Sequence, residues 1–370
     1  MHFELSDEQA MLRETSRDLL APRASGTIDR AQLDRDDDID PARWQLMAEL
    51  GWPGLALPEQ HGGSGQGLVE LALLAEEIGR AAAPGPLLST ALVGRALSLG
   101  GAPQLQAEVV PLLAEGTAWA SWAFAEPHQP WTPEGVHATA RTDGDTVMLD
   151  GVKTAVQDAG GARWLLVTAR HENTLASFLV DRNQPGVTVR RQRVLDLTRA
   201  FYEIRLDGVR ISRERALLDG AAGVQRLLDE AFVLVSAETL GVMDRMLEMT
   251  VAHLKVRVQF DRPVGSFQAV KHKCANMAML VHGTRAATYL AAMTADAEDA
   301  GAARSACVAA SWASTGAADV AGEALQLHGG VGFTWEHDLH LYLRRAKADA
   351  VLFGDDTVHR DRLCELIRQS

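Results

Sequence analysis

The order of sequence patterns along the chain is the feature that most constrains its fold. Helical periodicity runs from the N-terminus to about Gly116, short β-rich runs follow over Thr117–Ile211, and long helical patterns return from Gly223 to the end. The middle segment shows no strand–helix–strand alternation, so a parallel α/β sheet is not expected there. The sequence therefore predicts a mainly α-helical protein with a central β domain.

Within these segments, the spacing of apolar residues predicts individual elements. From Leu68 to Ala83, apolar residues recur on one face with a period near 3.6, typical of an amphipathic helix, and Gly85 and Pro86 end it. In the middle segment, alternating apolar and polar positions separated by turn residues predict half-buried antiparallel strands in a small barrel or sandwich. The predicted strands are Val136–Arg141, Thr146–Leu149, Trp164–Arg170, Ser177–Val180, Val187–Arg191 and Tyr202–Leu206.

The last segment predicts a helical bundle. Its predicted helices run through Leu227–Leu254, Phe267–Val281 and Ala302–Leu327, and from near His337. Long helices with short connections favour an up-down arrangement. We therefore expect an N-terminal helical domain over residues 1–116, an antiparallel β-barrel domain over 117–215 and a four-helix bundle over 216–370.

Composition limits the class of protein. With 370 residues, 47% of them apolar, the chain can bury the cores of two or three packed domains. Its net charge of −13 argues against a nucleic-acid surface, although a few Arg and Lys residues suffice for a small anionic ligand. The 3 cysteines lack metal-ligand or disulfide spacing. Without a signal-peptide stretch or a long apolar run, a cytoplasmic protein with no membrane span is expected.

The stretch from Arg257 to Gln268 connects two predicted helices and carries groups suited to a ligand. Arg257 lies at a helix C-terminal end, which the helix dipole favours, and its guanidinium offers two parallel donors to a diphosphate. Phe260 can stack on an aromatic ring system. The alternative interpretation is ordinary helix-end chemistry, with a capping arginine and a turn that contains proline and glycine.

A second stretch, from Gln326 to Asp338, places a glycine-rich turn between two predicted helices. Gly329 and Gly330 let the backbone approach a phosphate or sugar closely, and the N-terminus of the next helix adds a positive dipole. A plain helix C-cap also explains Gly329. A binding site is favoured by the polar side chains around the turn, which are Gln326, His328 and Thr334.

Together with Gly51–Gly65 and Glu76–Arg80, these stretches resemble the acyl-CoA dehydrogenase family, in the same order and over essentially the whole chain. The resemblance implies FAD as cofactor, an acyl-CoA thioester as substrate and an electron-transferring flavoprotein as electron acceptor. In that family FAD lies across a subunit interface, and the neighbour's bundle holds its ADP half. The residues implied here are Arg257, Phe260, Gln268, Gln326, Leu327, His328, Gly329 and Gly330.

The chain departs from the family pattern where the flavin ring and the catalytic base are expected. Ala125 stands where the family has a threonine, and Ala155 stands where a tryptophan packs on the flavin. The lost aromatic contact is worth on the order of 1 kcal/mol or more. The reaction also requires a carboxylate near the acyl chain to remove the α proton. An ungapped match puts Phe353 in the position of the family's glutamate.

Other carboxylates are candidate bases. Some relatives carry the base on the first bundle helix, where Glu230 falls within one residue of the expected position. Glu238 lies two helical turns further on, and Asp355 and Asp356 follow Phe353. For each of these acids, a solvated or capping role is the alternative interpretation. Glu230 is the candidate catalytic residue that the resemblance indicates.

Three hypotheses for the function remain. In the first, the chain completes the FAD site of a homologous partner in an α₂β₂ heterotetramer, as in bacterial families tied to steroid side-chain breakdown. The Trp335–Arg345 stretch and the Phe353–Asp355 ending resemble one of the two subunit types. In the second, the chain is a self-sufficient homo-oligomeric dehydrogenase, or a related oxidase, that uses Glu230 or an aspartate. In the third, it is a non-catalytic binding or scaffolding subunit that keeps the fold.

Overall fold

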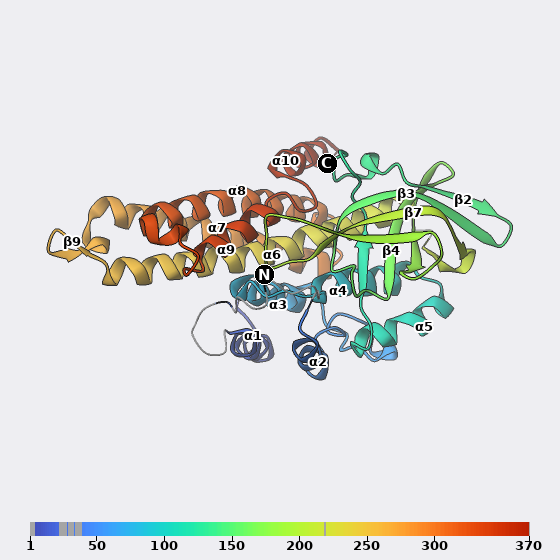
Figure 1. Cartoon of the computed structure of the whole chain (residues 1–370), viewed down its shortest axis with the longest axis horizontal. Helices are drawn as coiled ribbons and strands as arrows, with labels where there is room; N and C mark the ends of the chain where they lie inside the picture. The colour runs from blue at the N-terminus through green and yellow to red at the C-terminus, as the bar shows by residue number, and fades with distance from the viewer. Residues whose placement is uncertain (1–3, 22–27, 29–32, 34–38, 218–219, 370) are drawn as a thin grey trace.

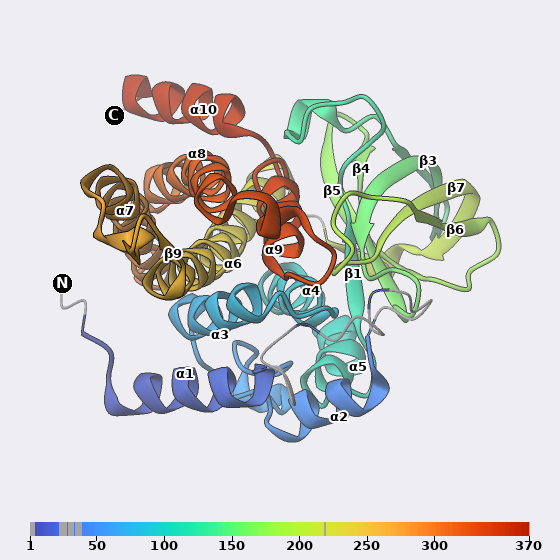
Figure 2. The ribbon, with the colours of Figure 1, turned by 60° about the vertical axis from the view of Figure 1, so that its left-hand side comes forward.

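The computed structural model describes residues 4–21, 28, 33, 39–217 and 220–369. Its parts follow the predicted order in space. The long C-terminal helices extend to one end of the molecule, the β domain forms the other end, and the N-terminal helices lie along one side of both (Figures 1 and 2). One apolar cluster contains buried residues from all three parts, so they share a core.

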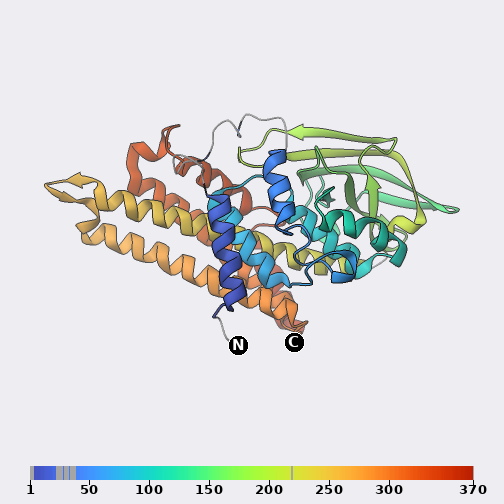
Figure 3. The ribbon, with the colours of Figure 1, turned by 90° about the horizontal axis from the view of Figure 1, so that it is seen from below.

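The N-terminal part is helical, as predicted. Its helices are α1 (Asp7–Leu20), α2 (Pro41–Glu49), α3 (Leu68–Ala81), α4 (Leu87–Gly100) and α5 (Pro103–Ala114). The helix predicted from Leu68 is confirmed as α3. It ends at Ala81 rather than Ala83 because Ala82 turns into the left-handed conformation, with φ of 45°. Figure 3 shows α1 lying across the long helices of the bundle.

The middle part is an eight-stranded sheet with the order β6-β7-β3-β2-β4-β5-β8, in which β1 also pairs with β4. The strands are β1 (Ala120–Ala123), β2 (Thr139–Asp143), β3 (Thr146–Gln157), β4 (Trp164–His171), β5 (Thr174–Asp181), β6 (Val187–Gln192), β7 (Phe201–Ser212) and β8 (Ala216–Leu217). The six predicted strands are thus confirmed as β2 to β7.

Two details of the predicted β domain differ. The strands are not all antiparallel, because β1 and β2 both pair with β4 in the parallel sense. The closed barrel is not confirmed, because the pairings of the described residues form an open path that ends at β6 and β8. Strand β1 was not predicted. All four of its residues are buried, so the sequence lacks the alternation of apolar and polar residues that marks a half-exposed strand.

The C-terminal part contains the long helices α6 (Gly220–Val256), α7 (Gln268–Asp296) and α8 (Ala302–His328), which confirm three of the predicted bundle helices. The fourth predicted helix is divided into α9 (Leu339–Asp349) and α10 (Asp356–Gln369). The break lies at Phe353 and Gly354, whose φ angles are 62° and 124°. Because helical residues have negative φ, this pair forces the chain out of the helix.

Two glycines allow α3 and α6 to pack backbone to backbone. A Cβ on Gly79 of α3 would lie 1.9 Å from the carbonyl oxygen of Glu238, and a Cβ on Gly241 of α6 would lie 1.8 Å from that of Glu76. Either distance is far below van der Waals contact. No larger residue fits at these positions unless the helices move apart, so the pair sets the distance between the N-terminal part and the bundle.

A buried cluster of charges joins the three parts. Arg345 of α9 is fully buried and forms ion pairs with Glu238 of α6 and, at 2.7 Å, with Asp196 in the β6–β7 loop. Arg199 of the same loop pairs with Glu238 and, at 2.7 Å, with Asp349 of α9. Buried charges require such partners because leaving water is costly.

The same arginine also reaches the N-terminal part. Arg345 donates hydrogen bonds to the carbonyl oxygens of Ala82 and Ala83, just after α3, and at 2.6 Å to the hydroxyl of Thr198 in the β6–β7 loop. One side chain therefore holds segments of all three parts in a fixed relation.

Asp349 is the least stabilised acid of this cluster. It lies 2.7 Å from Arg199, but its carboxylate oxygens accept no hydrogen bond from the described residues. Burial raises the pKa of Asp349 to about 7, although the charge of Arg199 opposes the shift. With Asp349 protonated, the two arginines face two carboxylates, and the cluster is neutral.

We expect Gly241→Ala to destabilise the fold by about 1 to 3 kcal/mol, because the added methyl group overlaps the backbone of α3. Gly322→Ala is the matched control, since Gly322 is exposed in α8 and a Cβ there meets no atom within 4 Å. The control should stabilise the protein by roughly 0.5 to 1 kcal/mol, through helix propensity alone. Urea denaturation of both variants checks this, and equal effects would contradict the close packing of α3 and α6.

We expect Asp349→Asn to change how stability depends on pH. Between about pH 4 and pH 7 the folded chain keeps a proton on Asp349 that the unfolded chain has released, so the free energy of unfolding falls as pH rises, by up to about 1.4 kcal/mol per pH unit. The asparagine variant should lose this component of the slope. The control is Asp145→Asn, at an exposed position in the β2–β3 turn, which should keep it. Denaturation at a series of pH values measures both, and parallel curves for wild type and Asp349→Asn would refute the assignment.

Candidate functional site

The free end of the bundle presents an aromatic ring on a tight hairpin. After α6 ends at Val256, β9 (Val258–Gln259) and β10 (Arg262–Pro263) pair through a two-residue turn of Phe260 and Asp261. Both turn residues have positive φ, 54° and 61°, as in a type I′ turn, which strains residues other than glycine. This turn leaves Phe260 86% exposed, where its ring can stack on a ring of another molecule.

The same end carries a local excess of positive charge. Between residues 253 and 273 the chain has 5 Lys or Arg residues and 1 acid, whereas the whole chain carries −13. The predicted site residues Arg257 and Gln268 are both exposed here. A cationic surface on an acidic protein suits an anionic group such as a diphosphate. The charged residues of this segment are Lys255, Arg257, Asp261, Arg262, Lys271 and Lys273.

The glycine turn that follows α8 is open on its outer side. Gly329 has φ of 61° and ψ of −145°, a conformation that is essentially restricted to glycine. Gly330 has no positive φ, and a Cβ on either residue would meet no atom within 4 Å. Internal packing therefore does not explain Gly330. A molecule that approaches this backbone closely would explain it. The predicted site residue Gln326, one turn earlier, is also exposed.

Histidine rings bring the two predicted stretches together. The ring of His328, at the end of α8, stacks on His253 of α6 at 4.6 Å and contacts His337 at 4.9 Å between centroids. The end of α8 therefore lies beside the last turn of α6, and both stretches belong to the same end of the bundle. We call this end, residues 253–273 and 326–337, the bundle tip.

Two of the predicted ligand residues do not face outward. His328 is buried, and its Nδ1 lies 2.8 Å from the carbonyl oxygen of Ala324, the arrangement of an N–H donor. Burial lowers the pKa of His328 to about 4, and the nearby rings of His253 and His337 lower it further. Leu327 is half-buried against the bundle core. The sequence motif includes Leu327 and His328 among the predicted ligand residues. The structure shows that both lie on the inner face of α8, where they support the glycine turn from inside.

The three departures from the family pattern lie around one small cavity. Ala125 follows β1, Ala155 lies in β3 and Phe353 precedes α10, yet all three line a space of about 20 Å³. A space of this size holds about one water molecule. The remaining lining residues are Ser89, Leu92, Trp122, Phe124, Trp131, Thr154 and Gln157.

Aromatic side chains fill the region around this cavity. Phe353 stacks on Trp122, with 5.6 Å between ring centroids and 23° between planes, and meets the edge of Trp131 at 5.3 Å. Trp122 also contacts Phe124 at 4.9 Å. We call these four residues the aromatic plug. A signal for it exists in the sequence, because three of its members lie within ten residues of each other in a chain with 5% aromatic residues.

Backbone conformation directs two residues into this region. The left-handed φ of Phe353 turns its side chain inward between α9 and α10. Ala155 has φ of 50° and donates its N–H to the side-chain oxygen of Gln192 at 2.9 Å. The parts of the family motif that the chain keeps are structural: Glu126 accepts hydrogen bonds from Lys153 at 2.7 Å and from the backbone N–H of Ala138 at 2.8 Å.

None of the candidate bases lines the cavity. Glu230 is buried at α6, where both of its oxygens accept hydrogen bonds from Arg95 of α4, at 2.7 and 3.0 Å. Glu238 belongs to the buried charge cluster. Asp355 caps α10 by accepting the N–H of Val358, and the side chain of Asp356 accepts the hydroxyl of Ser311 at 2.6 Å. Removal of a substrate proton by Glu230 would first require Arg95 to release it.

The described part of the chain also bears on metal binding and on membrane insertion. No cluster of three or more histidine, cysteine, aspartate or glutamate side chains there is arranged to hold a metal ion. Among the helices of the described ranges, none has the length and apolar character needed to cross a membrane.

Comparison with known proteins covers the whole chain. Family models described as the N-terminal, middle and C-terminal domains of acyl-CoA dehydrogenase match residues 6–117, 121–209 and 219–367. "Acyl-CoA dehydrogenase IpdE2" of Mycolicibacterium smegmatis is 34% identical over 95% of this chain and 96% of its own. A variant of the "Tcur3481-Tcur3483 steroid ACAD" superposes with a TM-score of 0.89 and 32% identity over 98% of each chain. The ChsE4-ChsE5 complex of Mycobacterium tuberculosis gives 0.92 and 27% over 100% of each chain.

We expect Phe353→Ala to destabilise the protein by about 3 to 5 kcal/mol, because it leaves a cavity between Trp122 and Trp131. Phe333→Ala is the control, since Phe333 is 69% exposed and its truncation should change stability by no more than about 0.5 kcal/mol. Urea denaturation compares the two. Similar small effects would show that the plug is not a packed unit.

Proposed function

We propose, because this chain belongs to the acyl-CoA dehydrogenase family, that it is one subunit of a hetero-oligomeric acyl-CoA dehydrogenase and completes the FAD site of a homologous partner chain. Members of this family are FAD-dependent enzymes that oxidise acyl-CoA thioesters. The observation that carries the proposal is the aromatic plug, which fills the region where the family resemblance locates this chain's own flavin ring and base.

We call the region around Ala125, Ala155 and Phe353, where the flavin ring is expected, the ring side. Its residues do not fit a flavin. The cavity between Ala155 and Phe353 has a volume of about 20 Å³, and three fused rings cannot enter it unless several aromatic side chains leave. Ala155 offers no aromatic face, and Phe353 offers no carboxylate. In the proposed assembly, this chain's own ring side therefore takes no part in the reaction.

The residues of the bundle tip fit the ADP half of FAD. Arg257 and its cationic neighbours suit the diphosphate, and the exposed ring of Phe260 suits the adenine. The open turn at Gly329 and Gly330 lets the backbone approach the ligand. When bound, FAD supplies the hydride acceptor of the reaction. The contribution of this chain is to hold the nucleotide end, with Gln268 and Gln326 as further polar contacts and with Leu327 and His328 supporting the turn from inside.

Further parts of the proposal rest on the relatives. One similar structure is named as a ChsE4-ChsE5 complex and another carries the double name Tcur3481-Tcur3483, which supports a homologous partner here. The α₂β₂ arrangement rests on the family resemblance. The Tcur3481-Tcur3483 structure is named as a steroid ACAD, which supports a bulky acyl-CoA, of the steroid side-chain type, as substrate. An electron-transferring flavoprotein is the proposed acceptor, the cytoplasm the proposed location, and divisions near residues 116 and 215 the proposed domain boundaries.

The alternative is a self-sufficient homo-oligomer that uses Glu230 as base. Two observations weigh against Glu230 as the base. It forms a buried ion pair with Arg95, and it does not line the small cavity beside the aromatic plug. In the proposed assembly the partner supplies both the base and the wall against the flavin ring. A non-catalytic subunit of the same fold would bind no flavin in any combination.

We expect the chain purified alone to contain no FAD, because its own ring side is filled. Purified together with its homologous partner, it should form a complex with visible flavin absorbance that acyl-CoA substrates bleach. Flavin that bleaches in the lone chain would overturn the proposal in favour of the self-sufficient enzyme. An assembled complex without flavin would overturn it in favour of the non-catalytic subunit.

Variants of the bundle tip, compared with a matched control, test whether this surface holds FAD. In the complex, Gly330→Val and Arg257→Gln should each weaken FAD retention by about tenfold or more, equivalent to about 1.4 kcal/mol. Gly322→Val is the control, because this exposed glycine also lies in open space, two turns before the glycine turn on α8. Equal FAD retention in all three would show that the tip does not hold the nucleotide.

A further inference from the structure

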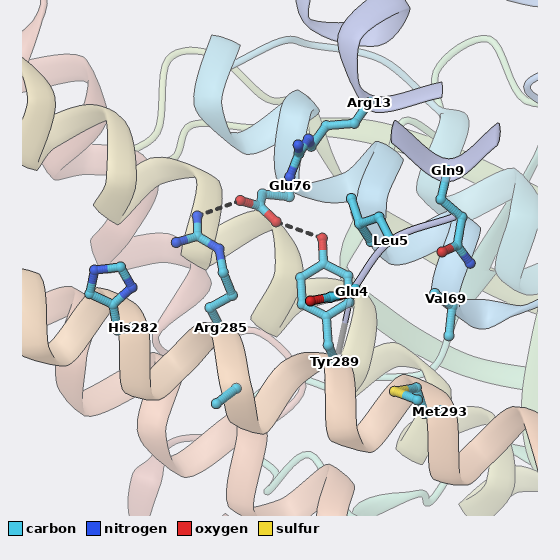
Figure 4. Close-up of a pocket in the computed structure, with 11 residues that line it drawn as sticks. Glu4, Leu5, Gln9, Arg13, Val69, Glu76, His282, Arg285, Tyr289 and Met293 are labelled. Atoms are coloured by element: carbon cyan, nitrogen blue, oxygen red, sulfur yellow. Dashed lines mark hydrogen bonds and ion pairs between the residues drawn. The ribbon is translucent and has the colours of Figure 1, made fainter. Parts of the chain in front are cut away.

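A cavity of about 410 Å³ lies between α1, α3 and α7, apart from both the bundle tip and the aromatic plug in the residues that line it (Figure 4). Its volume is within the range of small-molecule sites, which begin near 300 Å³. It is partly open to solvent, and no step of the proposed function uses it. Its lining residues are Glu4, Leu5, Gln9, Arg13, Val69, Glu76, His282, Arg285, Ala286, Tyr289 and Met293.

The floor of this cavity is a satisfied polar network. The carboxylate of Glu76, 5% exposed, accepts hydrogen bonds from Arg285 at 2.7 Å and from the hydroxyl of Tyr289 at 2.6 Å. Burial and the charge of Glu76 raise the pKa of Tyr289, so its hydroxyl stays protonated and remains a donor to Glu76. Since Arg285 neutralises Glu76, the floor is preorganised and has no net charge.

The cavity has a cationic end and an apolar end. Arg13 extends from α1 toward Glu76, and His282 lies beyond Arg285 on the same side (Figure 4). On the opposite side the walls are Leu5, Val69 and Met293, together with Gln9, whose amide nitrogen donates to Glu70 at 2.7 Å.

The charges of the lining leave one cation unpaired. Arg13 makes no ion pair with any residue in the described ranges, and the charge of Arg285 is used by Glu76. Glu4 also lines the cavity and is exposed, as Arg13 is, but the two side chains form no ion pair with each other in the described part of the chain. An unpaired guanidinium at one end of the cavity, with apolar side chains at the other end, favours a ligand with a single anionic head and an apolar body.

We propose that this cavity binds an amphipathic monocarboxylate of medium chain length. Its carboxylate pairs with Arg13 at the end where His282 and Arg285 also lie, and its hydrocarbon tail lies along Leu5, Val69 and Met293. The site goes beyond the proposed dehydrogenase function, since it includes no residue of the bundle tip or the plug. A bound ligand contacts the N-terminal helices and the bundle together, so it stabilises their packing by mass action.

The test is calorimetric titration of decanoate into the purified full-length protein, with decanol as the uncharged analogue. Decanoate should bind saturably, and decanol should bind at least about tenfold more weakly because it lacks the anionic head. Arg13→Gln should weaken decanoate by about tenfold, and Met293→Trp, which fills the apolar end, should abolish binding. Arg193→Gln is the control, since Arg193 is exposed in the β6–β7 loop and does not line the cavity.

Several outcomes would overturn this proposal. They are no saturable binding of decanoate, equal binding of decanol, or equal binding to Arg13→Gln and to the Arg193→Gln control. Binding that persists in Met293→Trp would place the ligand elsewhere on the protein. Because Arg13 is exposed, its variant tests the site even if the substitution at Met293 perturbs folding. FAD content plays no part in the measurement, so its result is independent of the proposed function.

Discussion

The structure depends most on the buried charges around Arg345. This side chain binds a carboxylate of the first bundle helix, a carboxylate of the β6–β7 loop and the carbonyl groups that follow α3. Buried ion pairs add little net stability compared with apolar packing, but they tolerate few alternative arrangements, because each unpaired charge is costly. The cluster therefore specifies how the three parts of the chain sit together. The closely packed glycines of α3 and α6 specify the distance between two of those parts.

With this arrangement fixed, the two halves expected of a flavin site have opposite character. The outer surface of the bundle tip is exposed and cationic, and its histidine rings pack on the inner side. The ring side is apolar, aromatic and closed. A chain that bound its own cofactor would need a cavity where this chain has a packed core. The contrast supports the proposal that this chain holds the ADP half of FAD while a partner holds the flavin ring and supplies the base.

Much of the fold could be predicted from the sequence because local patterns encode it. Long amphipathic periodicity identified α3 and α6, and alternation identified β2 to β7. Features that depend on long-range packing were missed: β1 is buried on both faces, and the fourth bundle helix breaks at Phe353, where only the left-handed backbone reveals the turn. Motif matching likewise grouped Gly330 with His328, although one faces outward and the other is buried.

The aromatic plug also has a consequence for the history of such a chain. Each of its rings is packed against another, so shortening any one of them leaves a void before it opens a usable pocket. A lineage that returned to an independent flavin site would need several substitutions at once, and each intermediate would be less stable than its ancestor. Loss of such a pocket would thus be far easier than its recovery, and in the proposed assembly selection would act on both chains as a single unit.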